Sequence, residues 1–159
     1  MSSMDSLHVA ILSGSPSDAD MVEACAEVLS HYGIAHESRV LSAHRQPEAL
    51  HRYIEEAESR GCRLYVAMAG MAAHLPGVVA SLTAKPVLGV PLKGGLMDGM
   101  DALLSVVQMP AGVPVASFAV GKAGAKNAGH HAARILALNN ESLAAKVQEF
   151  RAFMADGGR

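Results

Sequence analysis

Apolar residues along this 159-residue chain form short continuous runs that alternate with segments of helical spacing. In those segments apolar residues recur every three or four positions, as on one face of an amphipathic helix. Strands are therefore expected at 7–13, 34–41, 64–69, 86–90 and 113–120. Helices are expected at 16–32, from 47 to near 61, and at 75–82, 101–109, 123–138 and 142–154. Gly33 follows the first helix, where a left-handed cap is expected.

Strict alternation of strand and helix with short connections predicts parallel strands joined by right-handed crossovers. The run at 64–69 is apolar throughout, as in a central strand that is covered on both faces. The predicted fold is α/β: a flavodoxin-like three-layer αβα sandwich with a five-stranded parallel sheet, order 2-1-3-4-5, and an additional C-terminal helix. We expect residues 1–159 to form a single domain, with flexible ends at 1–6 and 156–159.

Polar clusters follow the first four predicted strands, at 14–18, 42–45, 69–74 and 91–95. In open parallel sheets, ligands bind beyond the carboxyl ends of the strands, near the point where the strand order reverses. The first three strands flank or adjoin that point, so we expect three of the four clusters to converge on one crevice.

The first cluster, G-S-P-S-D at 14–18, carries hydroxyls and free backbone N–H groups at a helix start, which suits a phosphate. Ser17 and Asp18 could instead only cap that helix. The carboxylate of Asp18 would repel a phosphate, so a ligand role for it favours ribose hydroxyls. Arg45 is a natural phosphate partner because its guanidinium is always charged and grips two oxygens. The alternative for Arg45 is a surface ion pair with Glu48 or a neighbouring acidic residue.

Two histidines follow predicted strands. His44 lies beside the anion-binding candidate, and an imidazole changes protonation near neutral pH, which favours general acid/base work over a structural role. His74 follows small residues that let a ligand approach the backbone; it could orient a carboxylate or only cap its helix. From the residues alone, the site binds a phosphorylated ribose-like ligand and has one or two histidines to move protons. The reaction stays open at that level.

The composition and charge of the chain limit the kinds of partner and cofactor that are expected. The net charge is −2 and no basic stripe is present, which argues against nucleic acid. Cys25 and Cys62 each lie in an apolar segment, as buried thiols of a reducing compartment do. No signal peptide or membrane span is visible, so a cytoplasmic protein is expected. His130 and His131 are adjacent on a helix and point about 100° apart, which makes them poor co-ligands; no metal or organic cofactor is indicated.

Several ordered motifs resemble the PurE family: G-S-P-S-D at 14–18, S-A-H-R at 42–45, A-A-H-L-P-G at 72–77, G-V-P at 89–91, D-A-L-L-S-V-V-Q-M-P at 101–110, G-V-P-V at 112–115 and G-K-A-G-A-K-N-A at 121–128. The match covers nearly the whole chain. S-A-H-R and A-A-H-L-P-G resemble the class I branch, N5-carboxyaminoimidazole ribonucleotide mutase. That resemblance implies an isomerase of de novo purine biosynthesis, which moves a carboxylate from the exocyclic nitrogen to the ring carbon without ATP, metal or cofactor. It also implies a homo-octamer.

The resemblance also implies roles for individual residues. His44 matches the catalytic general acid/base, and Ser15, Asp18 and Arg45 match substrate-binding positions. The other residues that match the family's pocket are Ser17, Ser42, Ala43, Gly70 and His74. The small residues Gly70, Ala72 and Ala73 would then wall a CO2-sized space.

Two departures from the family's pattern leave other activities open. Met71 stands where class I members usually have glycine, and Ala19 stands where the family tends to have tryptophan. The alternatives are an aminoimidazole ribonucleotide carboxylase that uses free CO2, and a PurE-like carboxylase with another substrate. A non-catalytic nucleotide-binding module is the third alternative.

Overall fold

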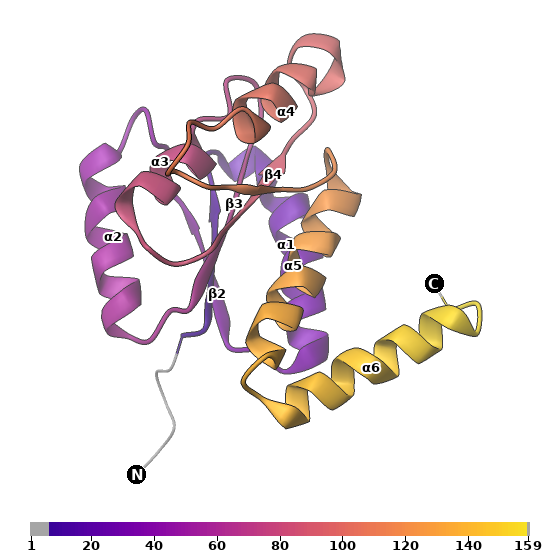
Figure 1. Cartoon of the computed structure of the whole chain (residues 1–159). Helices are drawn as coiled ribbons and strands as arrows, with labels where there is room; N and C mark the ends of the chain where they lie inside the picture. The colour runs from indigo at the N-terminus through magenta and orange to yellow at the C-terminus, as the bar shows by residue number, and fades with distance from the viewer. Residues whose placement is uncertain (1–6, 159) are drawn as a thin grey trace.

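A five-stranded parallel sheet forms the centre of the protein (Figure 1). The computed structural model describes residues 7–158. Its strands are β1 (Val9–Ser13), β2 (His36–Val40), β3 (Leu64–Ala69), β4 (Val87–Pro91) and β5 (Ala116–Ser117). Their order is β2-β1-β3-β4-β5 and every pairing is parallel, which confirms the predicted topology.

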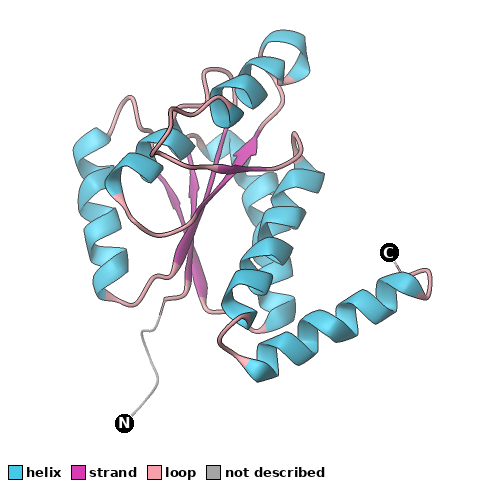
Figure 2. Ribbon diagram, in the orientation of Figure 1, coloured by secondary structure: helices cyan, strands magenta, loops and turns pink. Residues whose placement is uncertain are grey.

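Helices cover both faces of this sheet (Figure 2). The helices are η1 (Pro16–Asp18), α1 (Ala19–Tyr32), α2 (Pro47–Ser59), α3 (Leu75–Leu82), η2 (Leu96–Asp98), α4 (Met100–Val107), α5 (Lys122–Ala137) and α6 (Glu141–Ala155). Buried residues of α1 and α5 pack on one face, and those of α2, α3 and α4 on the other. The predicted three layers are confirmed. Helix α6 contacts α5 and α1, and in Figure 1 it starts beside the lower end of α5 and extends away from the sheet.

The central strands explain the continuous apolar runs. Along β1, Val9 and Ile11 face α1 and α5, whereas Ala10 and Leu12 face α2 and α3. The same alternation runs along β3, all six of whose residues are buried. Since successive side chains of a strand point to opposite faces, a strand covered on both sides needs an apolar residue at every position.

The last predicted strand is much shorter than expected. Only Ala116 and Ser117 of the 113–120 run pair with β4, opposite Leu88 and Gly89. This strand lies at the edge of the sheet and both of its residues are exposed, so few contacts extend the ladder. The apolar run at 113–120 predicted an extended segment, but it did not predict how many of its residues pair with β4.

The ends of the helices follow local chemistry. Gly33 has a φ of 70° and its N–H caps α1 by bonding to Leu29 and Ser30 carbonyls, as expected. The helix predicted at 16–32 divides at Asp18, whose ψ of 4° is not helical, into η1 and α1.

Several further expectations concern the ends and the compartment. The predicted flexibility of residues 1–6 and 159 concerns positions outside the described residues. Residues 156–158 continue α6 as a hydrogen-bonded turn. No helix within 7–158 is long and apolar enough to cross a membrane. Cys25 and Cys62 are buried free thiols.

Candidate active site

The loops that follow β1, β2, β3 and β4 surround a cavity of about 690 Å³, here called the carboxyl-edge pocket. It is lined by Gly14, Ser15, Ser17, Asp18, Ser42, Ala43, His44, Arg45, Ala69, Gly70, Met71, Ala72, His74, Leu75, Lys93 and Gly94. All nine residues proposed from the sequence are among them. The fourth polar cluster also reaches the pocket, so the expectation that three clusters converge was too narrow.

The first loop is held by its own serines. The Oγ of Ser15 accepts hydrogen bonds from the Ser17 N–H (3.3 Å) and from the Ser17 hydroxyl (2.8 Å). Ser15 therefore caps η1, and Asp18 makes no side-chain capping bond to α1. Burial raises the pKa of the Asp18 carboxyl, opposed by hydrogen bonds from Ser15 and Ser17. The alternative in which Ser17 and Asp18 only cap the helix is wrong, and Asp18 is free to accept ligand hydroxyls.

Arg45 reaches from the second loop to the first. Its Nη2 donates to the Gly14 carbonyl at 3.1 Å, and its Nε donates to the Ser42 hydroxyl at 3.3 Å. The backbone N–H of Arg45 also donates to that hydroxyl. Within residues 7–158 Arg45 forms no ion pair with Glu48 or with any other acidic residue, so that alternative is wrong. The guanidinium instead lies beside the loop that was expected to bind phosphate, where a permanent charge suits an anion.

His44 and His74, thirty positions apart, meet in the pocket. Nε2 of His44 lies 2.5 Å from Nδ1 of His74, and the rings are nearly perpendicular with centroids 4.7 Å apart. One ring nitrogen of this contact donates a hydrogen bond and the other accepts it, and the tautomers of the two rings decide which one donates. His74 makes no side-chain capping bond to α3, so the capping alternative for this residue is wrong. The pair can both supply a proton to a ligand and remove one.

The loop after β3 lies against the chain that follows β4. A Cβ atom on Gly70 would lie 3.4 Å from the Lys93 carbonyl oxygen and 3.7 Å from the Leu92 side chain, which is ordinary van der Waals contact. A small side chain would therefore fit at position 70, and the third and fourth loops are neighbours here.

Met71, next along this loop, has a conformation that is unusual for its residue type. Its φ is 55°, in the left-handed region that costs a residue with a Cβ about 1–2 kcal/mol. The side chain is 65% exposed although it is large and apolar. It lines the carboxyl-edge pocket beside Gly70 and Ala72.

Among the pocket residues that the sequence-based site omitted, Lys93 is the one with a charged side chain. It follows β4, and its Nζ lies 3.1 Å from Oδ2 of Asp98, with both side chains exposed. No motif marks it, but the polar cluster at 91–95 and the predicted place of that strand beside the third were a usable signal. Lys93 adds a second permanent cation to the pocket that contains Arg45.

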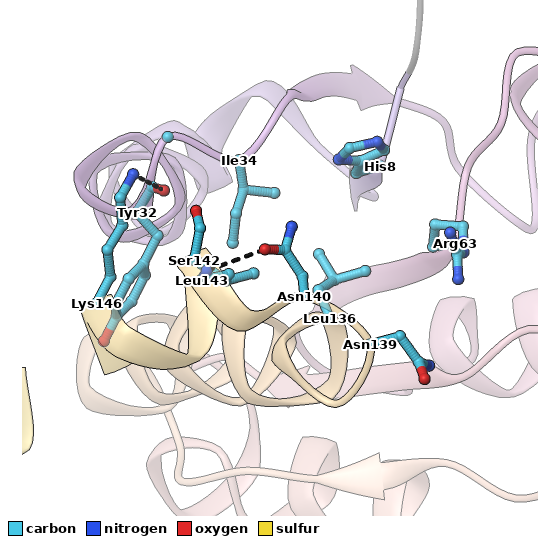
Figure 3. Close-up of a pocket in the computed structure, with 11 residues that line it drawn as sticks. His8, Tyr32, Ile34, Arg63, Leu136, Asn139, Asn140, Ser142, Leu143 and Lys146 are labelled. Carbon is cyan, nitrogen blue, oxygen red and sulfur yellow. Dashed lines mark hydrogen bonds between the residues drawn. The ribbon is translucent and has the colours of Figure 1, made fainter. Parts of the chain in front are cut away.

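A second cavity of about 210 Å³ lies at the opposite end of the strands (Figure 3). This amino-edge cavity is lined by His8, Tyr32, Gly33, Ile34, Arg63, Leu136, Asn139, Asn140, Ser142, Leu143 and Lys146. Lys146 donates from Nζ to the Tyr32 carbonyl at 3.0 Å, and Asn140 accepts from the Leu143 N–H at 3.0 Å. These bonds join α6 to α1 and cap α6, so Lys146 and Asn140 have structural partners. None of the nine proposed residues lies there.

The adjacent pair His130 and His131 serves packing. His130 hydrogen-bonds through Nδ1 to the Tyr32 hydroxyl at 2.9 Å and stacks on Phe150, with centroids 4.4 Å apart. Its neighbour His131 contacts the edge of a different aromatic ring, that of Phe118. Burial lowers the pKa of His130, as do the positive charges of Arg134, His31 and Lys126.

Comparison with known proteins agrees with this geometry. The family described as AIR carboxylase matches residues 8–156. The chain belongs to this family. The crystal structure of Treponema denticola PurE superimposes with a TM-score of 0.85 at 30% identity, and covers 94% of this chain and 92% of that one. The resemblance to PurE and the flavodoxin-like fold are thereby confirmed.

Relatives within the family share close to half of their residues with this chain. N5-carboxyaminoimidazole ribonucleotide mutase of Saccharolobus solfataricus is 51% identical over 142 residues, 89% of each chain. The protein of that name from Vibrio parahaemolyticus is 48% identical over 145 residues, 91% of this chain and 90% of its own length. The Bacillus subtilis protein of that name is 48% identical over 143 residues, 90% of this chain and 88% of its own.

Proposed function

We propose that this protein is an N5-carboxyaminoimidazole ribonucleotide mutase of purine biosynthesis, an isomerase that forms 4-carboxy-5-aminoimidazole ribonucleotide. The observation that carries the proposal is the convergence of the His44–His74 pair, Arg45 and the first loop on one 690 Å³ pocket. The relatives at 48–51% identity, which bear the mutase name over about 90% of the chain, support the same activity.

Binding follows from the charges around the pocket. Arg45 and the hydroxyls and backbone N–H groups of the first loop would hold the ribose 5-phosphate, because a guanidinium and a helix start both favour a phosphate. Asp18 would accept hydrogen bonds from the ribose hydroxyls. The aminoimidazole would then lie toward the histidines and the small residues Gly70 and Ala72.

The reaction needs one proton to be donated to the exocyclic nitrogen and one to be removed from the ring carbon. The bond between the exocyclic nitrogen and its carboxylate breaks, CO2 departs, and the nitrogen keeps the electron pair and takes a proton from His44. The electron-rich ring carbon then attacks CO2 and forms the new carbon–carbon bond. His44 finally removes the proton from that carbon, which restores the aromatic ring and returns His44 to its starting state. The atoms balance without ATP, metal or organic cofactor.

Two effects share the acceleration. A positioned acid/base contributes roughly 10²–10⁴-fold. The remainder would come from holding the aminoimidazole and CO2 together, since effective molarities for well-oriented partners reach about 10⁵–10⁸ M. Confinement of CO2 is therefore as important to this proposal as the proton transfer.

The proposal extends to assembly and location. We propose a homo-octamer in the cytoplasm, as the resemblance to PurE implies. The exposed apolar side chains Leu138, Phe153 and Met154, on or beside the projecting helix α6, support contacts between copies. Sedimentation velocity would test the assembly, with an octamer expected and a monomer contradicting it.

A carboxylase that uses free CO2 is the second candidate, because the family description names AIR carboxylase. The two activities are separated by supplying either N5-carboxyaminoimidazole ribonucleotide or aminoimidazole ribonucleotide with bicarbonate, under identical conditions. The mutase uses the first substrate with the higher kcat/KM. A preference for the second substrate would replace the mutase by the carboxylase.

A further inference from the structure

Met71 combines two unusual features with a place in the carboxyl-edge pocket; Met97 has the same two features but does not line that pocket. The backbone of Met71 is in the left-handed region, which glycine occupies without strain, and its large apolar side chain is mostly exposed. Among the described residues that line the carboxyl-edge pocket, it is the only large apolar side chain that is exposed; Leu75 is buried. Strained backbone of this kind persists where the surroundings or the function require it.

The position of Met71 indicates what the side chain can cover. Met71 lies between Gly70, which is beside Leu92 and Lys93 of the loop after β4, and the turn that carries His74. Bonds from the Ala73 N–H to the Met71 carbonyl and from the His74 N–H to the Ala72 carbonyl keep this turn tight. The Met71 side chain is therefore anchored a few residues from the histidine pair, at the wall made of small residues.

Methionine suits a cover. It is unbranched, turns about three bonds and presents a polarisable thioether, so it adapts its shape to a ligand. The other pocket walls are polar or small, and CO2 is neutral and poorly held by hydrogen bonds. An apolar side chain that folds over an occupied pocket excludes water and slows the escape of such a molecule.

We propose that the side chain of Met71 closes over the occupied carboxyl-edge pocket and retains the CO2 that is released from the substrate until the ring carbon captures it. This inference rests on the proposed mutase function. In this inference Met71 determines whether the released CO2 is captured by the ring carbon or escapes to solvent. This role is separate from binding the nucleotide and from moving the proton. The benefit of this cover offsets the backbone strain at position 71.

The test follows CO2 through the reaction. The full-length enzyme converts N5-carboxyaminoimidazole ribonucleotide in buffer containing 13C-bicarbonate, and the product is analysed for 13C, alongside the amount of free aminoimidazole ribonucleotide. A reaction without enzyme gives the background. The wild type is expected to return the original carboxylate to the product with little 13C.

Three variants separate the side chain from the strain. Met71→Ala removes the cover and keeps the left-handed Cβ, Met71→Gly removes both, and Met71→Leu keeps an apolar cover. We expect 13C incorporation to rise at least about tenfold in the alanine and glycine variants. Tenfold is the lower end of the range of effects that follow the loss of an apolar contact in a pocket. The leucine variant should stay near wild type, and the glycine variant should melt at a higher temperature than the alanine variant.

Equal, low incorporation in wild type, Met71→Ala and Met71→Gly would overturn the inference, as would full exchange in the wild type. If the wild type converts its substrate at a normal rate in those cases, the mutase function stands and only the role of Met71 fails. A wild-type enzyme that does not convert this substrate at all overturns both.

Discussion

The two ends of the sheet contain similar residues but use them differently. The carboxyl-edge pocket contains Arg45, Lys93 and two histidines, and the amino-edge cavity contains Arg63, Lys146 and His8. At the amino edge, Lys146 and Asn140 are engaged by the backbone of α1 and α6. At the carboxyl edge, His44 and His74 contact each other across two loops, and Arg45 links its own loop to the first loop through the Gly14 carbonyl.

This difference shows that composition does not identify a site. A cation next to a helix start serves either a ligand or the chain itself, and the geometry of its hydrogen bonds decides which. The carboxyl edge also has the larger cavity and the strained Met71, whereas the amino edge joins helices that pack together. Equivalent substitutions at the two ends should therefore have unequal effects.

Replacement of the histidines should give the largest contrast. His44→Asn removes the proposed acid/base and should lower kcat by about 10²–10⁴-fold. His8→Asn, in the amino-edge cavity, should leave kcat within about twofold, since surface changes away from a site are usually small. Steady-state kinetics measure both, and circular dichroism checks that both proteins fold. Activity of His44→Asn within tenfold of wild type would remove His44 from the mechanism. If the protein is instead a non-catalytic nucleotide-binding module, the wild type itself shows no turnover.

The arginines should show the next largest contrast, in binding. Arg45→Ala removes charge-assisted hydrogen bonds to the phosphate, which are worth about 1.5–3 kcal/mol, or roughly 10–100-fold in Kd. Arg63→Ala removes the same charge at the other edge and should not change Kd. Calorimetric titration with ribose 5-phosphate nucleotides measures both. Equal affinities for Arg45→Ala and wild type would contradict the phosphate role.

The smallest effect is expected in the dependence of stability on pH, from the packing of His130 near the amino edge. Burial lowers the pKa of His130 below its usual 6.5, so the folded state binds a proton less readily than the unfolded state. The contribution of neutral His130 to stability is present above about pH 6.5 and is lost as the pH falls toward and through the lower folded pKa. Thermal melting between pH 8 and pH 5 should therefore fall less in His130→Gln than in wild type.

The neighbouring variant His131→Gln is the control for that measurement, because His131 is exposed. It should follow the wild-type curve. If His130→Gln follows it too, His130 does not set the acid sensitivity of the fold. Arg134, His31 and Lys126 lie near enough to lower the pKa of His130, so the ionic strength is held constant through the series.

The sequence predicted the topology because the spacing of apolar residues within each strand and helix shows which of its faces is buried. The run at 64–69 and the spacing from Pro47 onward needed no tertiary information. The edge strand β5 was predicted too long because its pairing depends on neighbours rather than on its own residues. The family resemblance was confirmed by the AIR carboxylase match and the PurE structure.

The candidate site was predictable in membership but not in detail. The position of a residue after a strand indicated which side chains share an edge, and all nine line the pocket. The contact between His44 and His74 joins loops thirty residues apart and has no local signal. Lys93 and the left-handed backbone of Met71 also arise from how separate loops meet. The catalytic and binding roles of these residues stay predictions until the variants are measured.

The four loops that frame the pocket rise from separate strands, and the buried residues of those strands fill two apolar layers beneath them. Loop side chains that are exposed, such as those of Met71 and Lys93, can thus change without disturbing the buried layers that stabilise the fold. Such a scaffold could acquire a new substrate through changes in one loop while the other loops and the sheet stay the same.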